Sequence, residues 1–328
     1  SGWIARMNVE KTRSQLEEKQ VAIYFAAVVI AAIVALLIPG TTAAECAINP
    51  ALAFMLFVTF LQVPLVELGQ ALKQLRFMVA LLIANFVVIP LLVFALVGIF
   101  LEDPMLRLGV MLVLLAPCID YVVTFAHLGR ADARLLLAST PVLLIAQMLM
   151  LPLYLRLMLG AEVANYIEAG PFIHAFVWLI AVPLFMAGIT QLFAQHSATG
   201  KAISTYLGLT PVPATALVLI IVIISVLPQL GTALASVRQV LPLYVAYAVL
   251  APICGWWIAR KANLQVASSR AVAFSSATRN SLVVLPLALA VPGAIPVLPA
   301  IIVAQTLVEL ISELVYVRVI GRLGRGSN

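Results

Sequence analysis

Apolar runs of about 20 residues recur along nearly the whole chain, each long enough to cross a hydrocarbon core of about 30 Å as a helix. A membrane-spanning strand would be shorter and would alternate apolar and polar side chains. Only 10% of the residues are charged, against about 25% in soluble domains, and the mean hydropathy is +1.15. The sequence therefore predicts an all-α polytopic membrane protein. Ten transmembrane helices are expected, at residues 20–38, 50–71, 77–100, 107–128, 134–158, 171–193, 212–230, 240–260, 269–291 and 296–318.

Basic residues lie mainly on one side of the predicted bilayer. Counted together with the adjoining ends of the spans, the arm 1–19, the loops after even-numbered helices and the tail 319–328 carry 15 of the 19 Lys and Arg residues. The loops after odd-numbered helices, counted in the same way, carry three. By the positive-inside rule, both termini are cytoplasmic and the chain is a multi-pass protein of the inner or plasma membrane. The pI of about 9.4 follows from this bias, so no nucleic-acid partner is expected.

The three cysteines, Cys46, Cys118 and Cys254, show no paired spacing, so neither a disulfide framework nor a Cys-x-x-Cys metal site is expected. The sequence contains no phosphate-binding loop of the type G-x-x-x-x-G-K-[ST], which argues against a pump that binds ATP itself. A separate ATPase partner stays open. We expect no cofactor and no enzymatic activity; the expected partners are the lipid bilayer and a small substrate.

An internal repeat organises the chain. Shifted by 162 residues, the segment 67–90 aligns without a gap with 229–252, and nine of the 24 positions are identical. An odd number of crossings inverts the second copy, which places Arg76 inside and Arg238 outside. The predicted divisions are a cytoplasmic arm 1–19, a first five-helix repeat 20–158, a connecting loop 159–170, a second, inverted five-helix repeat 171–318 and a tail 319–328.

Polar residues interrupt two of the spans, at "APCIDYVVTF" (116–125) in the fourth helix and at "SSATRNSLVVLP" (275–286) in the ninth. The repeat register matches Pro117 with Arg279. Proline removes a helical hydrogen bond, and unwound backbone is tolerated at membrane depth only where protein or water satisfies it. We expect broken helices 4 and 9 to cross near the midplane and to form the substrate site.

Asp120 and Arg279 are the charged residues of these interruptions. A charge at the bilayer centre costs at least about 2.5–3.5 kcal/mol, so each must face a partner or water. If the two side chains pair, protonation of Asp120 would release Arg279 and couple protons to transport. A static ion pair that fixes helix packing is the alternative interpretation.

Five uncharged residues complete the predicted substrate site. Cys118 is a soft ligand when deprotonated, although a lone cysteine in an apolar helix also serves as a small core residue. Asn85 and Asn280 either line a cavity or hydrogen-bond between helices. Thr124 and Ser281 are further candidates. The substrate-binding set is Cys118, Asn85, Thr124, Asn280, Ser281 and Arg279.

Glu309 and Glu313 lie one turn apart in the last helix and are candidates for a proton path. Glu309 joins Asp120 as a coupling residue, while Glu313 lies nearer the cytoplasmic end and is expected to be solvated. Ser139 and Thr140 are expected to hydrogen-bond to the backbone of their own helix.

The motifs "ANFVVIP" in the third helix, "APCIDYVVTF" in the fourth and "RNSLVVLPLAL" in the ninth resemble those of the bile acid:sodium symporter superfamily. Within it, the chain is most similar to the arsenical-resistance permeases, which expel arsenite. The resemblance implies that Cys118 is the cysteine essential for metalloid transport, and that Asn85 and Glu309 match a family asparagine and glutamate. It also implies a core of helices 3–5 and 8–10 and a panel of helices 1, 2, 6 and 7.

The ninth helix departs from this pattern. The arsenite permeases typically read Asn-Asn-Phe-Glu-Leu-Ala where this chain has "RNSLVV", so Arg279 replaces an asparagine and Leu282 stands at the glutamate position. We expect Asp120 to take over the carboxylate's role. In sodium-coupled relatives this region holds two ions, and a fixed arginine both repels and replaces such an ion, so at least one sodium site is expected to be lost.

These features predict a secondary transporter, an antiporter that exports the trivalent metalloids arsenite or antimonite with proton coupling and without sodium coupling. Cys118 would then be a ligand of the metalloid substrate and not of a resident metal. The alternative is a carrier of a small organic anion that uses Arg279 as its anion contact.

Overall fold

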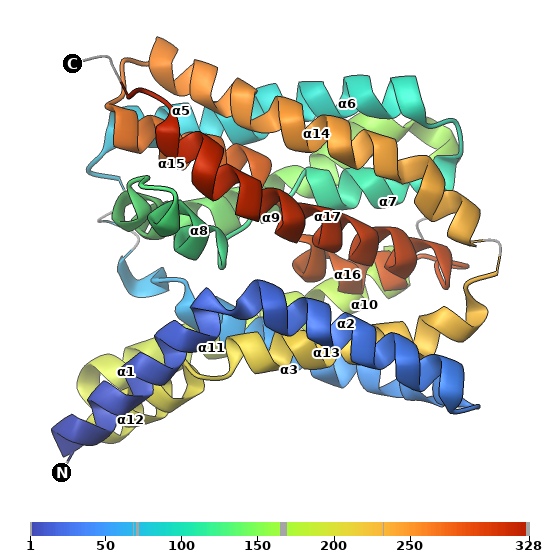
Figure 1. The fold of residues 1–328 in the computed structure, drawn as a ribbon, viewed down its shortest axis with the longest axis horizontal. Coiled ribbons are helices and arrows are strands. Elements are labelled where there is room, and N and C mark those ends of the chain that lie inside the picture. The colour runs from blue at the N-terminus through green and yellow to red at the C-terminus, as the bar shows by residue number, and fades with distance from the viewer. Residues whose placement is uncertain (1, 68, 70–71, 165–168, 232, 326–328) are drawn as a thin grey trace. The chain divides into compact units, whose positions relative to one another are not determined.

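The structure is a computed structural model that describes residues 2–67, 69, 72–164, 169–231 and 233–325 (Figure 1). Within these ranges the secondary structure is helical and contains no strand; a single isolated bridge joins two non-helical segments. The all-helical prediction is confirmed.

Eight helical segments of the described chain are long and apolar enough to cross a membrane. They are Gln20–Leu37, Thr41–Gln62, Leu75–Phe100, Ala133–Met158, Ile173–His196, Pro211–Gln229, Ala233–Lys261 and Val297–Arg322. Each overlaps a predicted span, so the chain is a multi-pass membrane protein. The other two predicted spans, 107–128 and 269–291, are each divided into two shorter helices. The inverted ten-helix arrangement stays a prediction.

The second span ends earlier than the prediction 50–71, which is wrong at this boundary. Helix α3 (Ile48–Gln62) follows the 3-10 helix η1 (Thr41–Ala47) and stops before Pro64. Val63 is extended, with φ −78° and ψ 125°, because the residue before a proline is sterically disfavoured in the helical region. A short 3-10 helix, η2 (Leu65–Glu67), comes next.

The helices form two compact units, unit 1 (Ser1–Val66 and Ala169–Gly231) and unit 2 (Glu67–Glu168 and Thr232–Asn328). Unit 1 holds predicted helices 1, 2, 6 and 7, and unit 2 holds predicted helices 3–5 and 8–10, which are the panel and core groupings implied by the resemblance. Each unit combines helices from both halves of the chain. The division into repeats 20–158 and 171–318 therefore stays a prediction.

Unit 1 is a bundle built around α13, which packs against α2 and α3, while α11 packs against α3 and α12. Its elements besides η1 and α3 are α1 (Gly2–Glu18), α2 (Gln20–Leu37), α10 (Ala169–Phe176), the π-helix η4 (Val177–Ala181), α11 (Val182–His196), α12 (Ala198–Leu207), α13 (Pro211–Val226) and the 3-10 helix η5 (Leu227–Gln229).

The end of α3 is held by Gln191 of α11. Its Nε2 donates to the carbonyl oxygens of Leu61 and Val63 at 3.2 and 2.5 Å, and its Oε1 accepts from the backbone N–H of Leu65 at 3.0 Å. One buried side chain thus satisfies the backbone groups that the break at Pro64 leaves without helical partners.

Unit 2 packs α14 along α15, α17 and α6, and packs α17 against α7 and α16. Its elements are α5 (Leu75–Ile83), the π-helix η3 (Ala84–Val88), α6 (Ile89–Phe100), α7 (Pro104–Leu114), α8 (Val122–Leu128), α9 (Ala133–Ala164), α14 (Ala233–Lys261), α15 (Val266–Ala277), α16 (Ser281–Leu289), α17 (Val297–Val319) and the 3-10 helix η6 (Ile320–Arg322). The predicted connecting loop 159–170 is partly helical, since α9 continues to Ala164 past a kink at Gly160; residues 165–168 lie outside the described residues.

The π-helix η3 has a local cause in Pro90. Proline has no N–H, so the carbonyl of Phe86, four residues earlier, loses its usual helical donor. The hydroxyl of Tyr154 on α9 donates to that carbonyl instead. The widened turn carries Asn85 on its buried side, and π-turns of this kind are frequent at functional sites.

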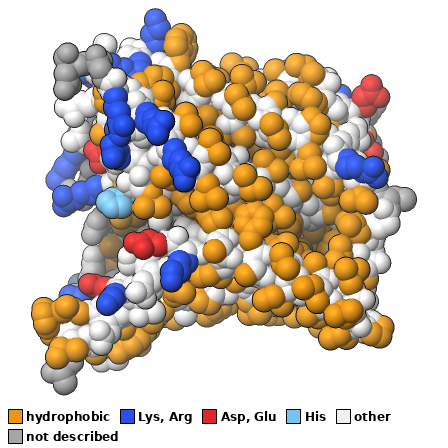
Figure 2. Space-filling model, viewed as in Figure 1, with side chains coloured by type: hydrophobic (Ala, Val, Ile, Leu, Met, Phe, Trp, Pro, Cys, Tyr) orange, Lys and Arg blue, Asp and Glu red, His pale blue; other side chains and the backbone are white. Residues whose placement is uncertain are grey.

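Large apolar side chains are exposed on the flanks of the long helices, as the orange surface in Figure 2 shows. Examples are Leu91 on α6, Leu149 on α9 and Phe185 on α11. Contiguous exposed apolar surface of this kind marks contact with another apolar phase, which for helices of this length is lipid.

Candidate functional site

Two helix breaks meet inside unit 2. The first separates α7 from α8 over residues 115–121, and the second separates α15 from α16 over residues 278–280. The backbone N–H of Cys118 donates to the carbonyl of Thr278 at 3.0 Å, and that of Asn280 donates to the carbonyl of Ala116 at 2.8 Å. The two unwound segments therefore satisfy each other's backbone groups, as buried irregular backbone requires.

The pair at the centre of this crossing is Pro117 and Arg279, which form an antiparallel bridge. These are the two residues that the repeat register matches. The structure thus confirms that both predicted breaks exist and that they lie side by side.

Arg279 is completely buried, with 0% of its surface exposed. Its Nη2 donates to Asn85 Oδ1 at 2.6 Å and to the carbonyl oxygens of Ser275 and Ser276 at 2.5 and 2.9 Å, and its Nη1 reaches the carbonyl of Leu114 at 3.5 Å. Three of these oxygens are backbone carbonyls at the ends of α7 and α15, where the helix dipole is negative. Oriented dipoles therefore stabilise the buried guanidinium.

Asn85 links the π-helix η3 to the second break. Its Oδ1 accepts from Arg279, and its Nδ2 donates to Ser275 Oγ at 3.0 Å and to the carbonyl of Leu81 at 3.1 Å. The side chain is fully buried. Of the two interpretations from the sequence, hydrogen bonding between helices is what the structure shows for Asn85.

Two buried carboxylates of α17 face the second break. Glu309 Oε1 accepts from the backbone N–H of Arg279 at 2.5 Å and from Gln305 Nε2 at 3.2 Å, and its other oxygen accepts from the hydroxyl of Tyr121. Glu313 Oε1 accepts from the hydroxyl of Thr278. Glu309 therefore hydrogen-bonds to residues of both breaks.

The prediction that Glu313 is solvated is wrong, because its side chain has 0% exposure. Residues four apart lie on the same face of a helix, so the face of α17 that turns Glu309 toward the crossing also buries Glu313 against Thr278. The helix face on which Glu313 lies, and not its distance from the end of α17, decided its environment.

The remaining predicted residues occupy different places around the crossing. Cys118 is a free thiol in the first break with 1% exposure, and Asp120 is half-buried in the same segment. Ser281 Oγ shares a hydrogen bond with Thr306 Oγ1 of α17 at 2.7 Å. Thr124 is half-buried on α8. A direct pair between Asp120 and Arg279 stays a prediction.

Several buried polar atoms at the crossing have no hydrogen-bond partner within the described residues. They are Arg279 Nε, Asn280 Nδ2, Gln305 Oε1 and Glu313 Oε2. Orphaned buried polar atoms are rare in native proteins and cost about 1–3 kcal/mol each. Their concentration in one place fits a site that accommodates a polar guest or water.

Sequence reasoning missed four contributors to this cluster: Tyr121, Ser275, Thr278 and Gln305. The signals were present, because Ser275 and Thr278 stand in the polar segment before Arg279, and Gln305 lies one turn before Glu309. Tyr121 gave no signal of its own, since tyrosine is common in apolar helices. Elsewhere, Ser139 and Thr140 donate to carbonyls of their own helix at 2.8 and 2.7 Å, as predicted.

The chain has a match among known protein families. The sequence model of the sodium bile acid symporter family matches residues 49–235, more than half of the chain. The chain belongs to this family. No curated protein matches the sequence. Members of the sodium bile acid symporter family are transporters, and membership indicates that this multi-pass membrane protein is a secondary transporter. The matched range includes the first break and ends before the second.

Proposed function

We propose that this protein exports trivalent metalloids, arsenite or antimonite, with the crossing of the two breaks as the substrate site. The single observation that carries the proposal is the position of Cys118, a free and buried thiol whose backbone is hydrogen-bonded to the second break. A soft sulfur ligand suits a metalloid. Arsenite is mostly neutral at pH 7, so its site needs no compensating charge.

The polar groups beside the thiol also support a metalloid substrate. Asn280, 7% exposed, carries an amide nitrogen without a partner, and its backbone N–H bonds to Ala116 in the break that holds Cys118. An amide donor close to a sulfur ligand fits the hydroxyl groups of arsenite. Thr124 adds a hydroxyl on the helix that follows the break.

Proton coupling without sodium is the second part of the proposal. The oxygens of Asn85, Ser275 and Ser276 around Arg279 are of the kind that hold a monovalent cation, and here they hold a guanidinium fixed to the chain. A fixed positive charge excludes a sodium ion from that position. With sodium excluded, carboxylates can bind and release the coupled proton, and we assign this role to Asp120 and Glu309.

A carrier of a small organic anion is the second candidate. The orphaned Nε of Arg279 favours it, because a carboxylate could accept from that atom. The other guanidinium contacts go to fixed parts of the protein, so an anion would have to compete with Asn85 and with the backbone of α15. We therefore place the metalloid first.

The deciding experiment measures uptake of arsenite and antimonite into everted vesicles with an imposed pH gradient and with sodium varied. The wild type is compared with Cys118→Ser and with the control Cys254→Ser, a half-buried thiol on α14. We expect uptake that depends on the pH gradient, is indifferent to sodium and is lost only in Cys118→Ser. Equal uptake in both variants would contradict the proposal.

Asp120→Asn tests the coupling role separately. The substitution keeps the size of this half-buried side chain and removes its charge and its proton. We expect arsenite to cross down its own gradient while acceleration by the pH gradient disappears. Full proton-coupled uptake by Asp120→Asn would remove this residue from the mechanism and leave Glu309 as the carrier.

The anion alternative has its own test. Arg279→Gln should abolish uptake of a small carboxylate while Cys118→Ser leaves it intact. Metalloid uptake that needs Cys118, together with no carboxylate uptake above empty vesicles, would exclude the organic-anion carrier.

A further inference from the structure

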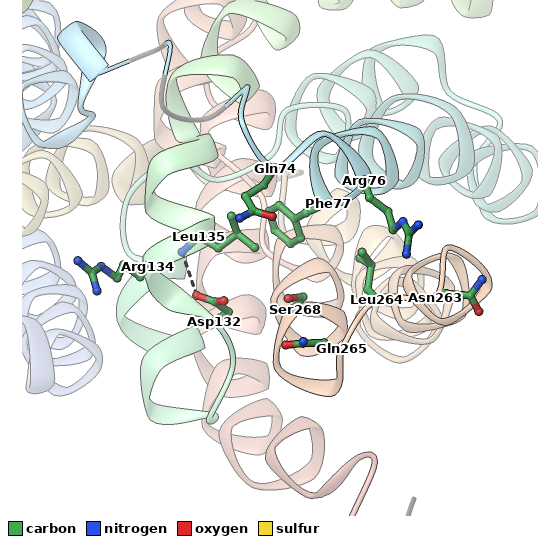
Figure 3. A pocket seen from close by; sticks show the side chains of 10 residues that line it. All are labelled: Gln74, Arg76, Phe77, Asp132, Arg134, Leu135, Asn263, Leu264, Gln265 and Ser268. Carbon is green, nitrogen blue, oxygen red and sulfur yellow. Dashed lines mark hydrogen bonds between the residues drawn. The ribbon is translucent and has the colours of Figure 1, made fainter. Parts of the chain in front are cut away.

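A cavity of about 650 Å³ lies at one end of unit 2, away from the crossing (Figure 3). Its wall is built where three helices begin: Gln74 and Arg76 come from the start of α5, Asp132 and Arg134 from the start of α9, and Gln265 and Ser268 from the start of α15. None of these residues takes part in the candidate substrate site.

The charges of the wall favour an anion. Arg76 and Arg134 are exposed, and within the described residues neither guanidinium has a hydrogen bond or an ion pair. Figure 3 shows them on opposite sides of the group of lining residues, with the guanidinium of Arg134 pointing away from the other side chains. The amides of Gln74 and Gln265 and the hydroxyl of Ser268 add neutral donors.

Asp132 is the one acidic residue among those that line the cavity, and its carboxylate already has a partner. Its Oδ1 accepts from the backbone N–H of Leu135 at 3.0 Å, which caps the start of α9. Its backbone N–H donates to the carbonyl of Ala267 at 3.0 Å and so joins α9 to α15. Two arginines and one aspartate give the lining residues a net positive charge. The carboxylate of Asp132 is already hydrogen-bonded to the start of α9.

The N-terminal ends of α5 and α15 also favour an anion in the cavity. The residues before α5 and α15, Gln74 and Gln265, make no side-chain capping hydrogen bond. The first N–H groups of these two helices therefore lack a side-chain acceptor, and the positive ends of both dipoles are at the cavity wall. Phosphate oxygens suit such N–H groups particularly well.

The surroundings indicate where the anion comes from. Helix α14 ends at Lys261, just before the cavity residue Asn263, and its last turns place Arg260 over the ring of Trp256 and Lys261 over the ring of Trp257, each at 5.7 Å. Tryptophan paired with basic residues at a helix end is typical of the membrane–water interface. Figure 2 shows Lys and Arg side chains gathered at this end of the unit.

We propose that this cavity binds the phosphate group of an anionic phospholipid of the cytoplasmic leaflet. Arg76 and the N–H groups at the start of α15 hold the phosphate, Arg134 adds positive charge beside it, and the acyl chains lie along the apolar flanks of the helices. Basic pockets between transmembrane helices on the cytoplasmic side are known hosts of such headgroups. The lipid would join the starts of α5, α9 and α15, and α15 leads directly to Arg279.

The test uses the full chain purified in a neutral detergent. Binding of phosphatidylglycerol, phosphatidylcholine with the same acyl chains, and inorganic phosphate is measured by native mass spectrometry and by the shift in thermal unfolding temperature. The variants are Arg76→Gln, the double change Arg76→Gln with Arg134→Gln, and the control Arg238→Gln. Arg238 is the repeat counterpart of Arg76, is likewise exposed, and does not line the cavity.

We expect the wild type and Arg238→Gln to bind phosphatidylglycerol in preference to phosphatidylcholine. The double variant should bind it about tenfold more weakly, since a hydrogen bond to a charged group contributes on the order of one factor of ten. The double variant is taken as folded if its unfolding temperature in phosphatidylcholine equals that of the wild type. If the double variant is not folded, Arg76→Lys replaces it in the test.

Unchanged phosphatidylglycerol binding in the double variant would overturn the proposal, as would an equal loss in Arg238→Gln. Inorganic phosphate that binds and protects as well as the lipid would overturn the lipid as the source, and would assign the cavity to a soluble phosphate. The readouts do not depend on transport, so this inference and the metalloid proposal fail independently.

Discussion

The two helix breaks of unit 2 cross each other, yet they arise in different ways. The first contains Pro117, which has no N–H to donate to a helical hydrogen bond, whereas the second, residues 278–280, contains neither proline nor glycine. In the second break, Thr278 and Arg279 are held by groups from α17, η3 and α7. The first break thus has a local signal as well as partners, whereas the second has partners alone, so the second should be more sensitive to the loss of a partner.

The largest effect is expected at Arg279. Arg279→Gln removes the guanidinium that donates to Asn85 Oδ1 and to the carbonyls of Ser275 and Ser276. The carbonyl of Ser276 keeps the hydroxyl of Tyr247 as a donor, but Asn85 Oδ1 and the carbonyl of Ser275 lose the donor that the guanidinium supplied. We expect a loss of about 3–5 kcal/mol in the free energy of unfolding, measured by denaturant titration in detergent. Arg279→Lys should lose less because it keeps the charge. The exposed Arg238→Gln is the control, and an equal loss there would show that the second break is not held by these contacts.

Thr278→Val should have the next largest effect. It removes the hydroxyl that donates to Glu313, and the carboxylate is then buried without any hydrogen-bond partner within the described residues. A loss of about 1–3 kcal/mol is expected, measured in the same way. The double variant with Glu313→Leu should recover part of that loss, because both partners are then apolar. No recovery would mean that the hydroxyl stabilises the break through its own helix.

Tyr121→Phe addresses the first break. The hydroxyl of Tyr121 donates to Glu309, but the side chain is only half-buried and Glu309 keeps its bond to the backbone of Arg279. We expect a loss of about 1 kcal/mol. A loss as large as that of Arg279→Gln would show that the two breaks depend equally on distant partners, which would contradict the comparison.

Pro117→Ala is expected to change stability least. The pairing of Cys118 with Thr278 and of Asn280 with Ala116 keeps the segment unwound even without proline. A loss of only about 0.4–1 kcal/mol is expected, from the greater freedom of the unfolded chain. Hydrogen exchange of the Cys118 amide measures the result directly. Loss of protection there would show that Pro117 alone maintains the break and that α7 and α8 have joined.

Much of the fold was predictable because its signals are local. Long apolar runs predict spans, and eight of these spans overlap a continuous helical segment of the structure. The two least uniformly apolar spans are the two that break, and the polar residues around Pro117 indicate the position of one break. The early end of α3 could also have been predicted, because Pro64 disfavours the helical conformation at Val63. The apolar run continues past Pro64, and for that reason the predicted span was too long.

The candidate site was predictable only in part. Cys118, Asn85, Arg279 and Glu309 stand out because polar residues are costly at membrane depth, and the structure places all four in unit 2 around one crossing. Glu313 shows the limit of such reasoning. Its position near a helix end suggested solvent, but the face on which it lies decided its burial.

The sequence by itself therefore determined that this chain crosses a membrane many times, which spans are interrupted and which polar residues belong to those interruptions, because hydropathy and proline chemistry act within a few residues. Only the tertiary structure decided the partners: that α17 supplies the carboxylates, that oxygens from η3, α7 and α15 surround Arg279, and that three helix starts enclose a basic cavity. Those contacts join residues up to 194 positions apart, and such pairs are selected by packing and hydrogen-bond geometry, which no local pattern carries.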